Sequence, residues 1–254
     1  MKATGMNSSL QSIPLCRRLC TMAVTSLLLC QGLQAIPLRV LAWDEEIAAR
    51  KLAIAGAKEF VTIQAMHPSK RTKVYQVIGG DKPVTIQALD KTDKDGKPAT
   101  SGILLPPTIK QALLVILPDA KAATGLRLVV LEDDAPNFPW GCSRFINACG
   151  RKLAFVYEKK LTALPVSWEP VLVNPGGDNR NMEVQIFLFD DPQRPIYSAV
   201  WEQRQDVRTL IFIVPGEDPR LGPVAMKMIS EDRRVKEREA KAAAANHAPP
   251  DQKL

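Results

Sequence analysis

Hydrophobic and polar residues alternate with a period of two over most of the chain from Lys51 to Ile229. β-Branched residues dominate this region, turn residues recur at intervals of roughly ten, and helical periodicity is nearly absent. We therefore expect an all-β fold, an antiparallel β-sandwich of the immunoglobulin-like or jelly-roll-like kind. The pattern predicts strands over 51–55, 59–66, 73–78, 84–89, 111–117, 126–131, 142–148, 153–158, 161–164, 171–173, 182–189, 195–202, 207–214 and 224–229.

One predicted strand departs from the alternation. Leu113 to Leu117 are all apolar, which is typical of a strand that is buried on both faces. The polar and small residues of the following segment, 118–125, are typical of a boundary between units. We expect two β units, over 44–118 and 126–230, with one continuous sandwich as the alternative.

The last part of the chain changes character. Glu231 and Asp232 precede Lys236 and Lys241, an order of charges that suits the dipole of a helix over 230–246. The paired prolines at 249 and 250 end such a helix. Residues 231–254 are thus expected to form a short C-terminal helix with a disordered tail.

The N-terminal part resembles an export signal, because Arg17 and Arg18 run into a short apolar segment, 19–29. This segment is well short of the ~20 apolar residues that cross a bilayer. Cleavage is predicted after Ala35, with Ala42 as the alternative site, so the signal comprises residues 1–35. The protein is expected to be exported to the periplasm or beyond, with no transmembrane span once the signal is removed. A lipid anchor on Cys30 is a minor alternative, as is export by the twin-arginine route.

Charge argues against one class of partner. The signal holds three cations and no acid, so its removal lowers the formal net charge from +7 to +4. The remaining lysines and arginines are interleaved with acids, as in 91–95, and form no basic stripe of the kind that nucleic acid requires. We expect no nucleic-acid partner.

Cys142 and Cys149 are the two cysteines that remain after the signal. An extended strand between them would separate their Cα atoms by about 23 Å, whereas a disulfide tolerates at most ~7 Å. The strand and a bridge exclude each other, and the strand pattern of 144–147 favours two reduced thiols.

Motifs for catalysis or metal binding are scarce. Beyond the signal the chain has two histidines, His67 and His247, which argues against a zinc cluster or a catalytic triad. The segment 93–96 begins like a calcium loop, but its twelfth position is a glycine instead of a glutamate. Three acid pairs near prolines are interpreted as turn residues, with a calcium site or a glycosidase pair as the alternative: Asp133-Asp134, Asp190-Asp191 and Glu217-Asp218. We assign no catalytic, cofactor-binding or metal-binding residue.

A short echo occurs within the chain: Val61 to Ala65 repeats as Val84 to Ala88. Five residues are too few to indicate duplication, and two neighbouring strands in similar surroundings would produce the same pattern.

Aromatic residues supply the candidate binding positions. Tyr197 and Trp201 share one face of a predicted strand, and Trp140 and Trp168 occupy loops beside prolines. Exposed rings bind sugars or apolar partner surfaces, whereas buried rings would fill the core. We expect a non-enzymatic structural or binding module of the cell envelope or periplasm whose partner is an envelope protein or a polysaccharide. The alternative is a carbohydrate-binding or carbohydrate-active protein.

Overall fold

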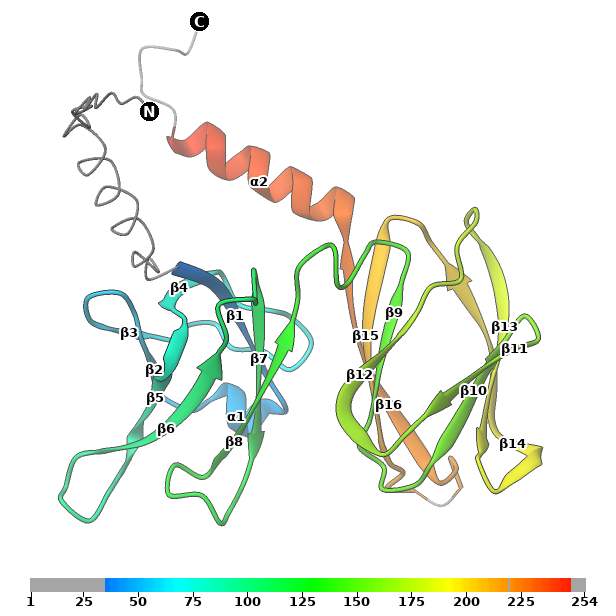
Figure 1. The fold of residues 1–254 in the computed structure, drawn as a ribbon, viewed down its shortest axis with the longest axis horizontal. Helices are drawn as coiled ribbons and strands as arrows, with labels where there is room; N and C mark the ends of the chain where they lie inside the picture. Colours follow the sequence, from blue (N-terminus) through cyan, green and yellow to red (C-terminus); the bar gives the residue numbers. More distant parts are fainter. Residues whose placement is uncertain (1–34, 219, 248–254) are drawn as a thin grey trace, which may run out of the picture. The chain divides into compact units, whose positions relative to one another are not determined.

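The computed structural model describes residues 35–218 and 220–247. The signal predicted over 1–35 lies outside them apart from Ala35. Figure 1 labels the elements. They are β1 (Ala35–Ala42), α1 (Glu45–Ala48), β2 (Leu52–Ala55), β3 (Phe60–Thr62), β4 (Tyr75–Ile78), β5 (Gly80–Thr92), β6 (Pro98–Leu105), β7 (Ala112–Pro118), β8 (Leu126–Glu132), β9 (Ser143–Asn147), β10 (Leu153–Tyr157), β11 (Lys160–Leu164), β12 (Ser167–Val173), β13 (Arg180–Leu188), β14 (Asp191–Gln203), β15 (Val207–Pro215), β16 (Val224–Asp232) and α2 (Arg233–His247).

The strands form four sheets of four strands each, which confirms the mostly β sandwich fold. The first sandwich consists of sheet A, in the order β4-β1-β7-β8, and sheet B, in the order β3-β2-β5-β6. The second consists of sheet C, in the order β12-β9-β15-β16, and sheet D, in the order β11-β10-β13-β14. Each pair of sheets encloses its own hydrophobic core.

The two sandwiches repeat the same topology. Adding eight to each strand number of sheets A and B gives the strand orders of sheets C and D. The directions agree as well, because β1 pairs with β7 in parallel and β9 pairs with β15 in parallel, while the other pairings are antiparallel. The repeat is therefore a whole sandwich. The echo of Val61 to Ala65 is not part of this repeat, because its first copy begins in β3 and its second lies in β5 of the same sheet.

The continuous apolar stretch in β7 has a direct explanation in the layers. Leu114 and Ile116 point into the core shared by sheets A and B. Leu113 and Val115 point the other way, into a third cluster that sheet A shares with sheet C. All four are at most 1% exposed, so the predicted double burial of this strand is confirmed.

The chain passes from one sandwich to the other later than the predicted boundary. The segment 118–125 is the turn that joins β7 to β8 within sheet A. It is closed by the Asp119 amide donating to the Gly125 carbonyl at 2.9 Å, and Gly125 has a positive φ of 72°. The crossing occurs over 133–142, between β8 and β9.

Two strands are additional to those that the pattern predicts. β1 is a central strand of sheet A, and its Leu38, Val40 and Leu41 are fully buried. β6 forms a hairpin with β5 through a turn in which Gly96 has a φ of 74°. The predicted strand over 142–148 is β9, and Cys142 and Cys149 are free thiols.

The C-terminal helix is present as α2, directly after β16 (Figure 1). The side chain of Asp232 accepts a hydrogen bond of 2.9 Å from the amide of Arg234 and so caps the first turn. None of the helices in the described part of the chain has the length and apolar character needed to cross a membrane.

Candidate functional site

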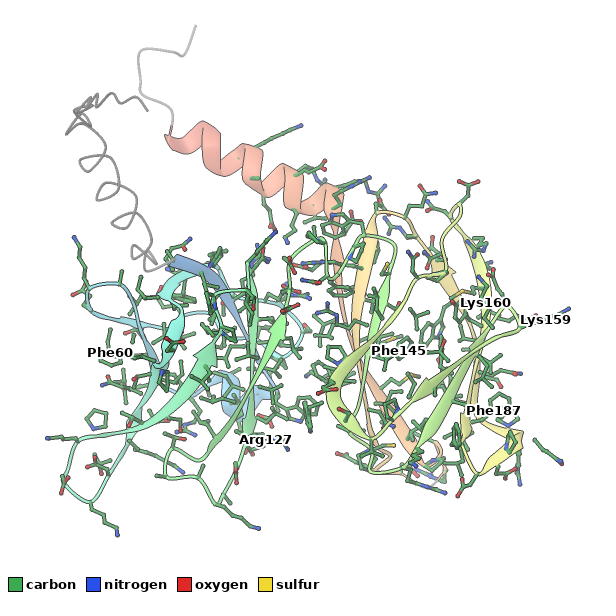
Figure 2. The ribbon with its side chains drawn as sticks, viewed as in Figure 1. Phe60, Arg127, Phe145, Lys159, Lys160 and Phe187 are labelled. Atoms are coloured by element: carbon green, nitrogen blue, oxygen red, sulfur yellow. The ribbon has the colours of Figure 1, made fainter. Side chains whose placement is uncertain are left out.

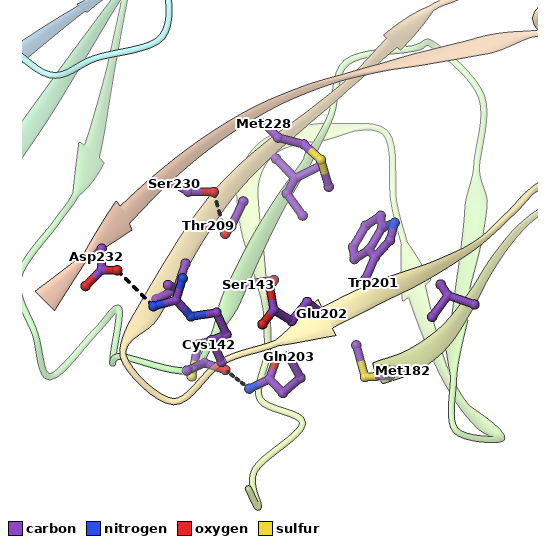
Figure 3. Close-up of a pocket in the computed structure, with 15 residues that line it drawn as sticks. Cys142, Ser143, Met182, Trp201, Glu202, Gln203, Thr209, Met228, Ser230 and Asp232 are labelled. Carbon is purple, nitrogen blue, oxygen red and sulfur yellow. Dashed lines mark hydrogen bonds and ion pairs between the residues drawn. The ribbon is translucent and has the colours of Figure 1, made fainter. Parts of the chain in front are cut away.

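A groove of about 540 Å³ opens on one side of the second sandwich (Figure 3). Its walls come from both sheets: β13 and β14 of sheet D on one side, and β9, β15 and β16 of sheet C on the other. β14 and β16 are the edge strands of their sheets, each paired with a single neighbour in the described structure. Two strand edges therefore border the same groove.

Hydroxyl groups line the sheet C wall. Ser143, Thr209 and Ser230 are opposite one another in the register of β9, β15 and β16, so they form a row across the sheet. The Thr209 and Ser230 hydroxyl oxygens are 3.0 Å apart (Figure 3). Two residues further along, the row continues with the apolar Phe145, Ile211 and Met228. The wall thus changes from polar to apolar within one step of the pleat.

Trp201 provides the aromatic part of the groove. Its ring stacks on Phe145 of the opposite sheet, with centroids 6.2 Å apart and planes 11° from parallel. Its indole nitrogen donates to the Tyr197 hydroxyl at 3.0 Å. Figure 2 shows Phe145 within the second sandwich, while Lys159 and Lys160 lie at its periphery. Trp201 therefore joins the core on one side and the groove on the other.

The groove has a charged rim. Arg204 donates to Asp206 and, at 2.9 Å, to Asp232. Arg234 pairs with the same two carboxylates, so the four charges balance. Glu202 is exposed and belongs to no ion pair among residues 35–218 and 220–247. Two exposed apolar side chains flank the opening, Val200 on β14 and Met228 on β16. The rim can thus supply one free carboxylate beside apolar contact surface.

The inner end of the groove is held by buried polar contacts. The Gln203 side-chain amide donates to the Gly141 carbonyl at 2.8 Å. Gly141 has a φ of 81°, a conformation that glycine adopts without strain. Cys142 beside it is buried, and this burial raises the pKa of its thiol. A raised pKa keeps Cys142 protonated at neutral pH, which disfavours a nucleophilic role.

In the first sandwich, the strands that correspond to β14 and β16 are β6 and β8. These two strands lie against each other, and the Ser101 hydroxyl of β6 is 2.8 Å from the buried Thr124 hydroxyl just before β8. Ile103 and Leu105 of β6 are buried. The same topology is therefore closed in one repeat and open in the other.

The four aromatic residues singled out from the sequence occupy three places. Tyr197 and Trp201 lie together, as the shared strand face predicts, with Trp201 lining the groove. Trp168 packs against Trp43 and Phe212, with the Arg127 guanidinium 4.7 Å from its ring centroid. All four rings are half-buried, and they form no continuous aromatic row.

Trp140 belongs to a cluster of charges between the two sandwiches. The Arg208 guanidinium is 5.0 Å and the Lys236 ammonium 5.6 Å from its ring centroid. Arg208 bonds to Glu231 at 2.5 Å and lies 3.5 Å from Asp133. Arg71 approaches the same two carboxylates, at 3.2 Å from Asp133 and 3.6 Å from Glu231. Residues from distant parts of the sequence meet here.

This cluster corrects the interpretation of one acid pair. Asp133 and Asp134 are buried, at 2% and 7% exposure, rather than solvated turn residues. Arginines from both sandwiches compensate the Asp133 charge, and the Asn137 amide donates to Asp134 at 2.9 Å. Asp190 and Asp191 are exposed where β13 turns into β14, and Asp218 pairs with Arg220. Over the residues that the structure describes, no group of three or more His, Cys, Asp or Glu is arranged to hold a metal ion.

Comparison with known proteins adds little to these observations. No family model and no curated protein matches the chain. The chain is similar to a solved structure of a candidate cell adhesion protein from Bacteroides uniformis, at 7% identity over 78% of this chain and 98% of that one. The TM-score of 0.20 is too low to assign a fold or a function. The fold and the groove define this chain as a double β-sandwich protein with one open side.

Proposed function

We propose that this protein is an exported, non-enzymatic module of the cell envelope that binds an extended segment of a partner polypeptide in the groove of its second sandwich. The observation that supports this most is the pair of strand edges, β14 and β16, beside one groove. An edge strand offers unpaired backbone N–H and C=O groups to an added strand.

The lining of the groove suits such a segment. Side chains of an extended chain point alternately to its two sides, and the groove offers two kinds of surface. Its inner part has apolar side chains from Met182, Trp201 and Ile211, and its sheet C wall carries the hydroxyl row. The exposed Met228 at the opening, at 43% exposure, would lose water contact when the groove is filled. Val200, at 63% exposure, lies on the edge strand to which an added segment would pair.

A carbohydrate ligand is the second candidate, and one observation favours it. Trp201, the amide of Gln203 and the free carboxylate of Glu202 all line the groove. An aromatic ring and planar polar groups together can bind a sugar, because the ring contacts the apolar face of the sugar and the polar groups bind its hydroxyls. The partial burial of Trp201 against Phe145 and the separation of the other tryptophans argue against it.

A photo-crosslinking experiment tests the proposal. Val200 is replaced by the photoreactive residue p-benzoylphenylalanine, and Leu104 serves as the matched control, because it lies on the corresponding strand β6 and is 60% exposed. We expect an adduct with a polypeptide at position 200 and none at position 104. The purified partner, identified from the adduct, should bind the Val200→Asp variant at least about tenfold more weakly than the native protein.

Two results would contradict the proposal. The first is the absence of an adduct at position 200, or equal adducts at both positions. The second is saturable binding of the native protein to members of a glycan panel, with loss of this binding in the conservative Glu202→Gln variant. That result would show that the ligand of the groove is a sugar and not a polypeptide.

A further inference from the structure

A second cavity, of about 550 Å³, lies beside the charge cluster. It shares Ser230 and Asp232 with the groove, and its other lining residues are different. It is formed by β1, by the segment before β4, by the end of β16 and by the first turns of α2. Its cationic lining residues are Arg39, Lys70, Arg71, Lys73 and Lys236. None of these five cationic residues lines the groove proposed to bind a polypeptide.

The charges beside the cavity are unbalanced. Glu231 has four cations within 4 Å: Arg208 at 2.5 Å, Arg39 at 3.0 Å, Lys236 at 3.4 Å and Arg71 at 3.6 Å. Asp133 is the second carboxylate in contact with Arg71 and Arg208. Four cations whose side chains are at most 28% exposed thus share two carboxylates.

The other carboxylates that line the cavity do not remove this excess. Asp232 is engaged by Arg204 and Arg234, and Glu239 lies on the exposed surface of α2. Lys70 and Lys73 add two further positive charges at the opening, and both are exposed. Uncompensated positive charge in a partly buried site raises the free energy of the folded protein, so the binding of an anion there would be favourable.

Two donors in this cluster also make no hydrogen bond within the described residues. They are Arg71 Nη1 and Arg39 Nε, and both are buried. The Glu231 carboxylate oxygen nearest to Arg71 Nη1 is 3.6 Å away, too far for a hydrogen bond. The Arg71 side chain is only 2% exposed and lines the cavity. Buried guanidinium N–H groups are normally satisfied, and an unsatisfied one points to a missing acceptor.

We propose that this cavity binds a doubly charged oxyanion, a phosphate or sulfate group, at a site formed by Arg39, Lys70, Arg71, Lys73 and Lys236. A tetrahedral dianion would offset the two charges by which Arg39, Arg71, Arg208 and Lys236 exceed Glu231 and Asp133, and Lys70 and Lys73 would add to the attraction. It also presents several acceptor oxygens, so it can receive charge-assisted hydrogen bonds from guanidinium and ammonium groups at the same time.

Titration calorimetry on the full chain tests this site, with inorganic phosphate, inorganic sulfate and a sulfated dextran fragment as probes at constant ionic strength. We expect saturable binding of at least one probe. The double variant Lys70→Ala/Lys73→Ala should raise its Kd at least about tenfold. Both lysines are exposed, so their replacement should leave the fold intact.

The matched control is Lys82→Ala/Lys97→Ala, which removes two exposed lysines elsewhere on the first sandwich. It should bind the probes as the native protein does. Binding of sulfated dextran alone would assign the site to an anion carried on a polymer, and binding of phosphate or sulfate would show that the free ion suffices. No saturable binding of any probe, or an equal loss in both double variants, would overturn the proposal.

Discussion

Glu231 is the residue on which the charges between the two sandwiches converge. Its side chain is 11% exposed. Burial alone would raise the pKa of this carboxyl, but the nearby charges of Arg71, Arg208 and Lys236 lower it to about 2 from an ordinary value of 4.5. The native structure therefore favours the ionised form, and this preference is a contribution to stability.

The pH dependence of stability follows from this lowered pKa. The contribution of Glu231 is complete above pH 4.5 and is lost as the pH falls toward about 2, because the unfolded chain then binds a proton that the native state excludes. Denaturant unfolding between pH 7 and pH 2 should show this decline. In the Glu231→Gln variant the decline should be smaller, and an equal decline would contradict the role given to Glu231.

Replacement of Glu231 by Gln should also lower the free energy of unfolding at neutral pH. It leaves Arg39, Arg71 and Arg208 beside an uncharged group, and breaking a buried pair in this way costs about 3–5 kcal/mol. The control is Glu237→Gln on helix α2, which follows the strand of Glu231. The pair of Glu237 with Arg233 is exposed, at 3.9 Å, and is expected to contribute about 0–1 kcal/mol. Urea unfolding at pH 7 measures the free energy of unfolding of both variants. A similar decrease in the two variants would refute the prediction.

Much of the secondary structure could be predicted because burial leaves a clear period. The unbroken apolar run of β7 predicts its position between two layers, and the turn at Gly150, which has a φ of 78°, separates β9 from β10. β1 was not predicted, because its apolar residues directly follow the export-like segment and were interpreted as the end of that segment. β6 was not predicted, because Thr100, Ser101 and Gly102 interrupt the alternation of its apolar residues.

The groove and the charge cluster could not be predicted, for a different reason. Ser143, Thr209 and Ser230 come together only through the strand order of sheet C, in which β9 and β15 pair in parallel. Nothing local in the sequence sets that pairing. Similarly, the pair Asp133-Asp134 has the composition of a turn, and only the approach of Arg71 and Arg208 accounts for its burial.

β1 permits a prediction about the mature N-terminus. It lies between β4 and β7, so a chain that begins at residue 43 lacks a central strand of sheet A. Such a chain should fail to give a cooperative unfolding transition, whereas a chain that begins at residue 36 should unfold like the full-length protein. Circular dichroism during heating compares the two. A cooperative transition from the shorter chain would contradict the importance of β1.

The two sandwiches share a core as well as a charge cluster. Leu41, Leu113 and Val115 of sheet A meet Ile146 and Phe212 of sheet C, all at most 1% exposed. The Trp43 ring lies edge-on to Phe212 at 5.3 Å, and the Lys227 ammonium bonds to the Trp43 carbonyl at 2.5 Å. An apolar contact of this kind couples the stabilities of the units that it joins.

This coupling predicts one unfolding transition for the whole double sandwich. Phe212→Ala should destabilise the protein by about 3–5 kcal/mol. The control is Phe189→Ala, which should change the stability little because Phe189 is 55% exposed. Calorimetry should give a single peak for the native protein. Two separate peaks in the native protein would contradict the coupling.

The equivalence of the two shared faces has a consequence for how such chains can grow. In the register, Leu41 stands opposite Val115 and Leu113 opposite Leu131, just as Ile146 stands opposite Phe212 and Leu210 opposite Ile229. Matching patches meet, as they do in a symmetric dimer, and a contact of this type closes on itself. Both patches are buried within this pair, so a further copy of the sandwich would need a different surface to pack against the described part of the chain.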